Sequence, residues 1–223
     1  MEKRAIDTAA SPEIREFIRS NFPLVPVPSV PEIRLHKAGP KSGLWRLAKA
    51  DKDFGTPYWA YHWGGGLALA RHVLDHPQLV AGRSVLDLGA GSGIVGIAAA
   101  ISGAKRVVAA DIDRYAVAAT DLNATANGVT ISAVLGDLTT GSPPDVDTIL
   151  VGDLFYEAEL AQRVTAFLAR CLASNIEVFV GDPGRAFLPL HWLEKLAEHA
   201  GPDFGSGDGG EQGRNTVFAF RLA

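Results

Sequence analysis

The sequence predicts an α/β protein with a mostly parallel central sheet, helices on both faces of the sheet, and an antiparallel last strand. Two observations predict this class. From Ser84 onward, short β-rich runs alternate with longer runs of helical periodicity, which is typical of parallel strands joined by crossover helices. The last β-rich run, "NTVFAFRL", instead follows the glycine-rich turn "GSGDGGEQG" with no helical run between, so a closing hairpin makes it antiparallel.

The alternating runs define the elements in order. The β-rich runs cover residues 84–89, 106–111, 131–137, 148–153, 176–182 and 215–222. The helical runs cover residues 94–102, 115–127, 157–172 and 187–200. The last of these, "FLPLHWLEKLAEHA", is rich in strong helix formers and is predicted as a helix before the closing hairpin.

The chain before this alternation reads differently. Ser11 is predicted as an N-cap and Pro12 as the first helical position, and the apolar face that follows predicts an amphipathic helix (Ile14, Phe17, Ile18 and Phe22). The proline-rich stretch "PLVPVPSVPEIRLH" predicts an extended connector.

A second short helix is expected where the main domain begins. The three glycines of 64–66 predict a turn, and a helix is expected from about Leu67 to Asp75. We therefore expect a helical, proline-rich extension over residues 1–57 and one main domain over residues 58–223.

Composition and charge indicate a soluble globular chain. Hydrophobic content of 47% with 21% charged residues is enough for a full core, and a net charge of −4 argues against a general nucleic-acid binder. Residues 1–49 are basic and the rest is acidic, which we interpret as a solvated surface. Cys171 is the only cysteine, so neither an internal disulfide nor a cysteine zinc site is expected.

The expected location is cytoplasmic. A single cysteine fits a reducing compartment, and the N-terminal stretch lacks an apolar signal core and carries several acids. The longest apolar run, from Ile94 to Ile101, is too short to span a bilayer. We expect no membrane partner and no bound metal, and the sequence carries no pattern that defines an oligomeric state.

The stretch "SVLDLGAGSGIVG" admits two glycine registers. Gly91, Gly93 and Gly96 match the dinucleotide fingerprint, but there the strand should run directly into the first glycine, and Gly89 already breaks this strand. The better match is Asp87-x-Gly89-x-Gly91-x-Gly93. An acid at the strand end repels a pyrophosphate and suits a ligand with an amino group, while the glycines allow close backbone approach. NAD, and with it an oxidoreductase, is therefore disfavoured.

Two further acids end the next two strands. Asp111 closes the second strand, where a carboxylate can accept hydrogen bonds from both hydroxyls of a ribose, and Asp137 closes the third. The carboxyl ends of parallel strands meet at one edge of the sheet, so these side chains should face one crevice with Asp87. Three carboxylates fit a nucleoside that carries a cationic amino-acid tail.

These motifs carry a resemblance. The segments "VLDLGAGSG", "VVAADID", "GD" and "GDLFY", in this order and spacing, resemble the class I (seven-β-strand) S-adenosylmethionine-dependent methyltransferases over roughly residues 58–223. The resemblance implies a Rossmann-like, seven-stranded sheet, S-adenosylmethionine as the cofactor and S-adenosylhomocysteine as the product.

A narrower resemblance comes from "PYWAYHWGGG" and the Asp153-x-x-Tyr156 pair after the fourth strand. Both are similar to the lysine methyltransferases that modify the β-subunit of electron transfer flavoprotein. The resemblance implies a protein substrate with a target lysine, an acceptor channel lined by Asp153 and Tyr156, and these cofactor-site residues: Trp63, Asp87, Gly89, Gly91, Gly93, Asp111, Asp137 and Gly152. The family often has an aromatic residue where this chain has Leu138.

The "DLFY" segment has alternative interpretations. A lysine ammonium suits a carboxylate and an aromatic wall, whereas amide-nitrogen methyltransferases often have prolines here that this chain lacks. Asp153 could instead cap the following helix, Tyr156 could begin its buried face, and Trp63 could be a core residue rather than a cofactor lid.

The leading function is a protein-lysine N-methyltransferase acting on the electron transfer flavoprotein β-subunit or a similar protein. The alternatives are a small-molecule (nicotinamide-like) N-methyltransferase, a ribosomal protein L11-type lysine methyltransferase, and a non-catalytic module that binds S-adenosylmethionine. A methyl transfer from a sulfonium needs alignment of the two reactants and no protein nucleophile or metal.

Overall fold

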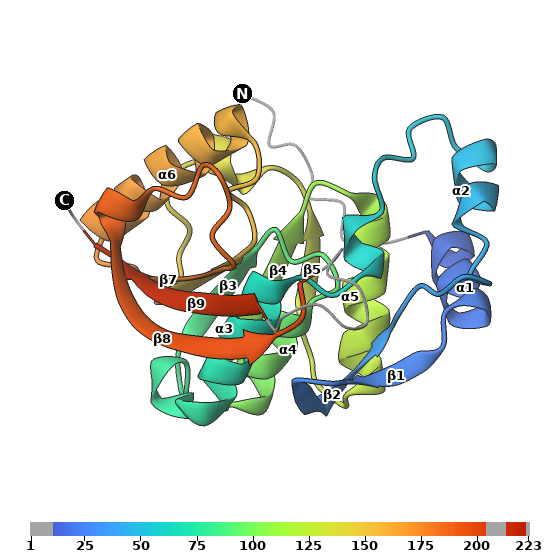
Figure 1. Ribbon diagram of the computed structural model, residues 1–223, viewed down its shortest axis with the longest axis horizontal. Coiled ribbons are helices and arrows are strands. Elements are labelled where there is room, and N and C mark those ends of the chain that lie inside the picture. The colour runs from blue at the N-terminus through green and yellow to red at the C-terminus, as the bar shows by residue number, and fades with distance from the viewer. Residues whose placement is uncertain (1–10, 204–212, 222–223) are drawn as a thin grey trace.

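A seven-stranded sheet runs through the molecule (Figure 1), in the order β5-β4-β3-β6-β7-β9-β8. The computed structural model describes residues 11–203 and 213–221. The strands are β3 (Ser84–Leu88), β4 (Arg106–Asp111), β5 (Ser132–Leu135), β6 (Thr148–Gly152), β7 (Glu177–Asp182), β8 (Leu193–Gly201) and β9 (Gly213–Phe220). The pairs among β3 to β7 are parallel, and β9 is antiparallel to both β7 and β8. The predicted Rossmann-like sheet with an antiparallel last strand is confirmed.

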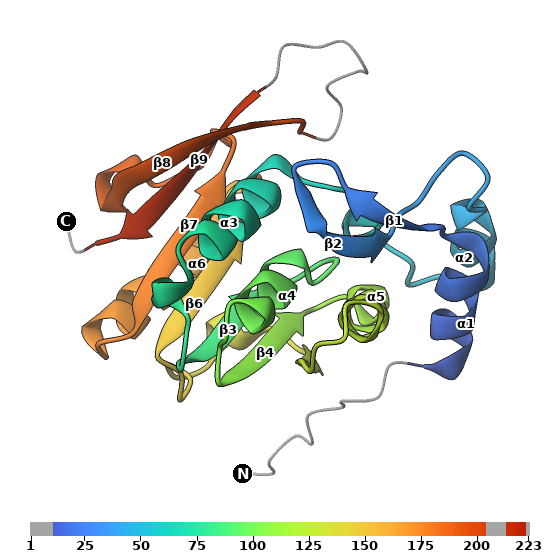
Figure 2. The same cartoon turned by 90° about the horizontal axis from the view of Figure 1, so that it is seen from below.

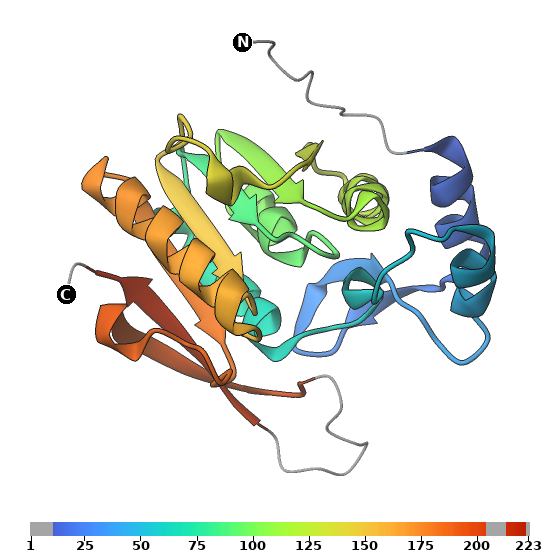
Figure 3. The ribbon, with the colours of Figure 1, turned by 90° about the horizontal axis from the view of Figure 1, so that it is seen from above.

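Helices cover both faces of the sheet, as predicted. Helices α3 (Gly64–Asp75), α4 (Ile94–Ile101) and α5 (Arg114–Ala126) lie on one face, toward the viewer in Figure 2. Helix α6 (Ala158–Ala173) covers the other face and is seen in front in Figure 3. The central strands β3, β6 and β7 are buried on both sides, which explains their nearly continuous apolar sequences.

The prediction of a helix over residues 187–200 is wrong. After a short 3-10 helix, η4 (Leu190–Trp192), this segment forms the edge strand β8, which pairs with β9 from Leu193 opposite Phe220 to Gly201 opposite Gly213. Its Leu, Glu, Lys and Ala residues favour a helix, but pairing along β9 overrides that weak preference. The glycine-rich turn predicted before β9 lies largely in 204–212, outside the described residues.

The N-terminal segment is more ordered than a connector. It contains α1 (Pro12–Asn21), the antiparallel hairpin β1 (Leu24–Val27) and β2 (Val30–His36), and α2 (Leu44–Ala50). Helix α1 begins at Pro12 as predicted, although the Ser11 side chain donates to the Glu13 carboxylate and makes no side-chain bond that caps the helix. The proline-rich stretch is extended, as predicted, but it is paired.

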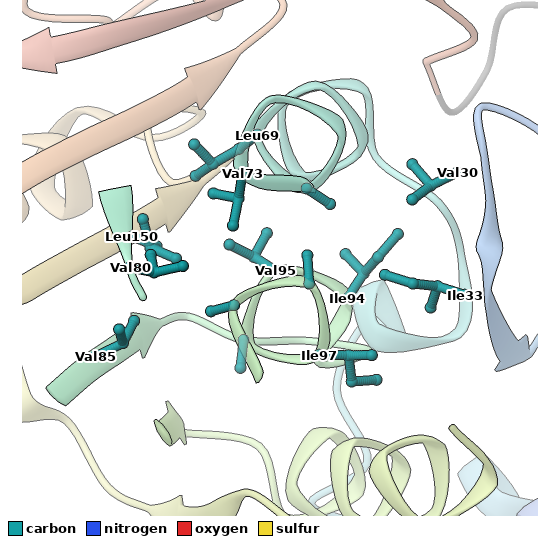
Figure 4. Close-up of a cluster of buried hydrophobic side chains, with 14 of the residues drawn as sticks. Val30, Ile33, Leu69, Val73, Val80, Val85, Ile94, Val95, Ile97 and Leu150 are labelled. Carbon is teal, nitrogen blue, oxygen red and sulfur yellow. The ribbon is translucent and has the colours of Figure 1, made fainter. Parts of the chain in front are cut away.

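This hairpin joins the core of the main sheet. Figure 4 shows Val30 and Ile33 of β2 beside Ile94 of α4, in a cluster that also contains Leu69 of α3 and Leu150 of β6. All of these side chains are buried. The N-terminal segment and the sheet therefore share one apolar cluster.

The three glycines predicted as a turn form the first turn of α3. A Cβ on Gly65 would lie 2.2 Å from the carbonyl oxygen of Gly181, and one on Gly152 would lie 3.0 Å from the Cα of Gly66. The N-terminus of α3 therefore packs backbone against backbone on the ends of β6 and β7. The remaining short helices are η1 (Tyr58–Ala60), η2 (Pro77–Leu79) and η3 (Leu138–Thr140).

Candidate active site

A cavity of about 780 Å³ opens at the carboxyl ends of β3, β4, β5 and β6. Strands β4 and β5 are added on one side of β3, whereas β6 and β7 are added on its other side. The crevice at the point where the strand order switches in this way is the usual ligand site of an open α/β sheet. The segment from Asp53 to Trp63 supplies one wall and the loop after β4 another. The volume suits a nucleoside-sized ligand.

The glycine loop after β3 supplies the floor of the cavity. Gly89 and Gly91 line it, and both have left-handed backbones, with φ of 70° and 54°. Gly93 also has a positive φ, of 80°, but it is not among the lining residues. A Cβ there would lie 2.9 Å from Cγ2 of Thr120, so Gly93 is required by packing against α5.

Asp87 does not reach the cavity. Its carboxylate is buried below the glycine loop and accepts a hydrogen bond of 2.8 Å from the backbone N–H of Gly96, in the first turn of α4. Burial raises the pKa of this carboxyl to about 7. The prediction that it faces the ligand with the other acids is wrong, because its position holds the loop against α4.

Asp111 and Asp137 do line the cavity, as their places at the strand ends predict. Asp111 accepts hydrogen bonds from the N–H groups of Gly91 and Asp113, each of 2.9 Å, and so ties the glycine loop to the end of β4. Burial raises its pKa to about 6. Asp137 accepts from the N–H of Thr139, and Leu138 adds an apolar side chain to the lining.

Asp153 stands at the other end of the cavity, directly after β6. It has a positive φ of 56°, which is uncommon for a residue with a side chain, and is only 9% exposed. Its Oδ2 accepts a hydrogen bond of 2.7 Å from the N–H of Gly66, so it caps α3. The alternative that it caps the following helix is wrong, since Glu157 occupies the N-cap of α6.

Arg185 is the main site residue that sequence reasoning missed. It lines the cavity, and its Nη2 donates to Oδ1 of Asp153 at 2.9 Å and to Oδ1 of Asp203 at 3.0 Å. Asp203 in turn accepts from the N–H of Gly64. The "GDPG" stretch before Arg185 repeats the end of β6, and that repetition was the available signal.

Three aromatic side chains line the cavity together with Asp153. Tyr58 lies with its ring centroid 5.4 Å from that of Trp63 and 5.5 Å from that of Tyr156. Tyr156 is 43% exposed, which excludes the interpretation that it begins the buried face of α6. Trp63 lines the cavity, and its Nε1 donates to the carbonyl oxygen of Tyr58, which agrees with a wall rather than a core residue.

The charges of the site favour a cationic ligand. Burial raises the pKa values of Asp111, Asp113 and Asp153, all of which line the cavity. A bound cation would offset the desolvation of these carboxylates. Among the residues that the structure describes, no group of three or more His, Cys, Asp and Glu side chains is arranged to hold a metal.

The residues fit the cofactor that the motifs imply. Gly89 and Gly91 provide a floor without side chains, and Asp111 and Asp137 provide acceptors for hydroxyl and amino groups. Burial raises the pKa of Asp111, and a ligand with a positive tail would offset that desolvation. Beyond this floor, Asp153 and the three rings provide a carboxylate and aromatic faces for an amine. The arrangement can align an amine acceptor with a nucleoside-bound donor.

Comparisons with known proteins agree with this arrangement. The sequence model of the family described as ribosomal protein L11 methyltransferase matches residues 68–157. A putative RNA methyltransferase from Pyrococcus horikoshii superposes with a TM-score of 0.53 at 16% identity, covering 80% of this chain and 98% of that one, which shows a shared fold.

Two curated relatives give the family. The electron transfer flavoprotein beta subunit lysine methyltransferase of Danio rerio is 40% identical over 203 residues, which are 88% of this chain and 79% of the relative. The protein of that name from Homo sapiens is 37% identical over 205 residues, which are 88% of this chain and 78% of the relative. This chain belongs to the family of electron transfer flavoprotein beta subunit lysine methyltransferases.

Proposed function

We propose that this chain transfers methyl groups from S-adenosylmethionine to lysine side chains of the electron transfer flavoprotein β-subunit. The observation that carries the proposal is identity of 35–40% with relatives that bear that name, over most of the chain. The site supports it, because an acid and three aromatic rings stand where an amine would enter.

The cofactor is S-adenosylmethionine, and it supplies an electrophilic methyl group on a sulfonium when bound. We assign Asp111 to the two ribose hydroxyls, Gly89 and Gly91 to the backbone floor, and Asp137 with Leu138 to the adenine side of the cavity. Asp87 and Gly93 act from outside direct contact, because they hold the loop to α4 and α5. Gly152 lines the cavity, and its lack of a side chain allows α3 to approach β6.

The protein-lysine acceptor is assigned to the other end of the cavity. Asp153 attracts the lysine ammonium and orients its Nζ, and Tyr156 with Trp63 gives aromatic faces that a cation tolerates. The Asp153 carboxylate also helps the ammonium to lose a proton, which frees the Nζ lone pair to take the methyl group. Alignment of this amine with the donor is then the main contribution of the protein to the rate.

Incubating the purified chain with methyl-labelled cofactor tests the proposal. The acceptors are the electron transfer flavoprotein heterodimer, ribosomal protein L11 and nicotinamide, each alone, and mass spectrometry locates the label. We expect label on lysines of the flavoprotein β-subunit. Label on L11 or nicotinamide alone would replace this proposal with one of the alternatives, and binding without transfer to any acceptor would favour a non-catalytic module.

The variant Asp153→Asn separates the acceptor end from the cofactor end. The amide oxygen can still accept from Gly66, but the charge beside the entering ammonium is lost. We expect methyl transfer to fall at least about tenfold, which is the loss of one hydrogen bond to a charged group. S-adenosylhomocysteine affinity, measured by calorimetry, should stay within about threefold of the wild-type value. Full activity would reduce Asp153 to a helix cap.

We propose that the partner of this chain is the protein substrate, and that the chain binds neither nucleic acid nor a membrane. None of the helices in residues 11–203 and 213–221 combines the length and apolar character needed to cross a bilayer. Cys171 lies on the buried face of α6. A cytoplasmic location stays a prediction, and fractionation of cells that express the tagged chain tests it.

A further inference from the structure

We propose that Arg185 is a positioning residue for methyl transfer, acting through Asp153, whose carboxylate it keeps ionised and fixed at the acceptor end of the cavity. The inference rests on the proposed lysine methylation. It concerns a residue in the turn that follows β7.

The turn is built to hold Arg185 in place. Oδ1 of Asp182, at the end of β7, accepts from the N–H groups of both Gly184 and Arg185, at 2.7 and 2.6 Å. Gly184 has a φ of 98°, a backbone conformation that side chains rarely adopt. The backbone of Arg185 is therefore fixed just after the end of β7. The neighbouring strand is β6, and Asp153 directly follows it.

The guanidinium is held on three sides. One nitrogen, Nη2, bridges the carboxylates of Asp153 and Asp203, and Cζ lies 5.4 Å from the ring centroid of Trp63. The Arg185 side chain is 21% exposed, so this charge is largely removed from water. The positive charge thus meets two acids and an aromatic face at once.

Asp153 is in turn held at both of its oxygens. Gly66 donates to Oδ2 and Arg185 to Oδ1, so rotation of the carboxylate would break one of the two contacts. A helix N-terminus and a cation both favour the ionised form of a carboxyl. The second contact is the one that a side chain supplies, and it can be removed by substitution.

The charges around Asp153 leave room for a second cation. Arg185 forms ion pairs with Asp153 and with Asp203, which follows β8. Asp182 at the end of β7 is a further acid near Asp153 and adds to the rise of its pKa. The single guanidinium is shared between two acids, so Arg185 can hold Asp153 without repelling a lysine ammonium.

The titration of Asp153 gives the inference a measurable sign. Burial raises its pKa to about 7, and Asp182 adds to the rise, while the Gly66 N–H and Arg185 oppose it. Tyr156, whose own pKa is raised by burial, is neutral in the relevant range. Removal of Arg185 therefore raises the pKa of Asp153 further and leaves less of the carboxylate ionised at neutral pH.

The test compares Arg185→Gln, Arg185→Lys and a matched control, Arg221→Gln. Arg221 pairs with Glu194 on the surface, at the end of β9 remote from the cavity. The turnover rate with saturating acceptor protein and cofactor is measured from pH 6 to pH 9.5, and S-adenosylhomocysteine affinity is measured by calorimetry.

We expect the acidic limb of the rate profile of Arg185→Gln to move up by about one pH unit or more, the size of an ion-pair contribution. For a shift of one unit from a pKa of about 7, its rate should be about fivefold below wild type at pH 7, nearly tenfold below at pH 6, and close to wild type above pH 9. Arg185→Lys keeps the charge and should keep the wild-type limb, as should Arg221→Gln, and cofactor affinity should be similar in all. A loss of the same factor at every pH, or no loss, would overturn the inference.

Two further results keep the outcome clear. If thermal melting shows that Arg185→Gln does not fold, Arg185→Lys is compared with Asp203→Asn, which leaves the charge beside Asp153; a limb raised in either variant would overturn the inference. Failure of the wild-type chain to label any lysine would instead overturn the proposed function.

Discussion

At the scale of single residues, Asp111 gives the sharpest prediction on cofactor binding. Substitution by Ala should lower S-adenosylhomocysteine affinity at least tenfold, because each hydrogen bond to a charged acceptor contributes roughly 1.5–3 kcal/mol. Its pKa of about 6 adds a pH dependence. Ribose hydroxyls donate to the ionised carboxylate, so affinity should fall as the pH falls below 6, by up to about tenfold per unit.

Calorimetric titrations between pH 5 and pH 8 measure this effect, with Asp111→Asn as the matched control. An amide does not titrate there, so the variant should bind weakly with no pH dependence of this kind. Equal slopes in wild type and variant would assign the titration to another group and would remove the ribose role from Asp111.

Single residues were predictable where chain order determines their place. Asp111, Asp137 and Asp153 each end a strand of a parallel sheet, so their meeting at one edge follows from the sequence. Tyr58 reaches the site through a tertiary contact that no spacing along the chain encodes, whereas Arg185 follows the end of β7 and had only the repeated "GDPG" as a signal. Asp87 was misplaced for a related reason: strand ends predict the edge, but not which side chains turn under the loop.

At the scale of elements, the glycines that begin α3 give a matched pair of variants. A Cβ on Gly65 would lie 2.2 Å from the Gly181 carbonyl oxygen, whereas one on Gly66 would have its nearest neighbour, Cγ2 of Ile94, at 3.7 Å. Gly65→Ala should therefore cost about 1–3 kcal/mol or more from overpacking. Gly66→Ala should be neutral or stabilising, by up to about 1 kcal/mol, because alanine favours a helix.

Urea unfolding of the two variants beside wild type measures the difference. Both substitutions add one methyl group to the same helical turn, so propensity alone predicts equal effects. Equal stability of the two variants would mean that the backbone contact between α3 and β7 is not tight.

The same scale shows where element prediction succeeds and fails. The strands from β3 to β7 are continuous apolar runs with acids or glycine at their ends, and their existence follows from that pattern. In β8, Leu193, Ala197, His199 and Gly201 are the more buried positions, but Leu, Lys and Glu between them also suit a helix. Only the partner strand β9 decides, and that contact is not local.

At the scale of the whole molecule, the N-terminal segment and the sheet share their apolar clusters. Val27, Val30 and Ile33 of the hairpin belong to the cluster that contains α3 and α4. Ile14 and Ile18 of α1 belong to a second one that contains residues of α5. The predicted boundary between residues 57 and 58 therefore separates parts of the sequence that pack together.

Asp51 adds a polar link between the same two parts. Its carboxylate accepts a hydrogen bond of 2.6 Å from the hydroxyl of Tyr115 and pairs with Arg114, both at the start of α5. Trp59 stacks between Phe22 of the N-terminal segment and Tyr115, with ring centroids 5.4 and 6.0 Å away. The wall of the cavity formed by residues 53–63 thus depends on contacts to both parts.

This packing predicts one cooperative unfolding transition for the whole chain. Ile33 is fully buried between the hairpin and α4, so Ile33→Ala should cost about 2–5 kcal/mol. For a chain of this size, each kcal/mol lowers the melting temperature by about 2–4 °C. The single transition should move to a lower temperature without splitting, and calorimetry checks both features.

Trp45→Ala is the matched control in the same segment: its side chain is 68% exposed, so its removal should change stability by less than about 0.5 kcal/mol. A separate early transition in Ile33→Ala, with the main transition unmoved, would show that the N-terminal segment unfolds as an independent unit.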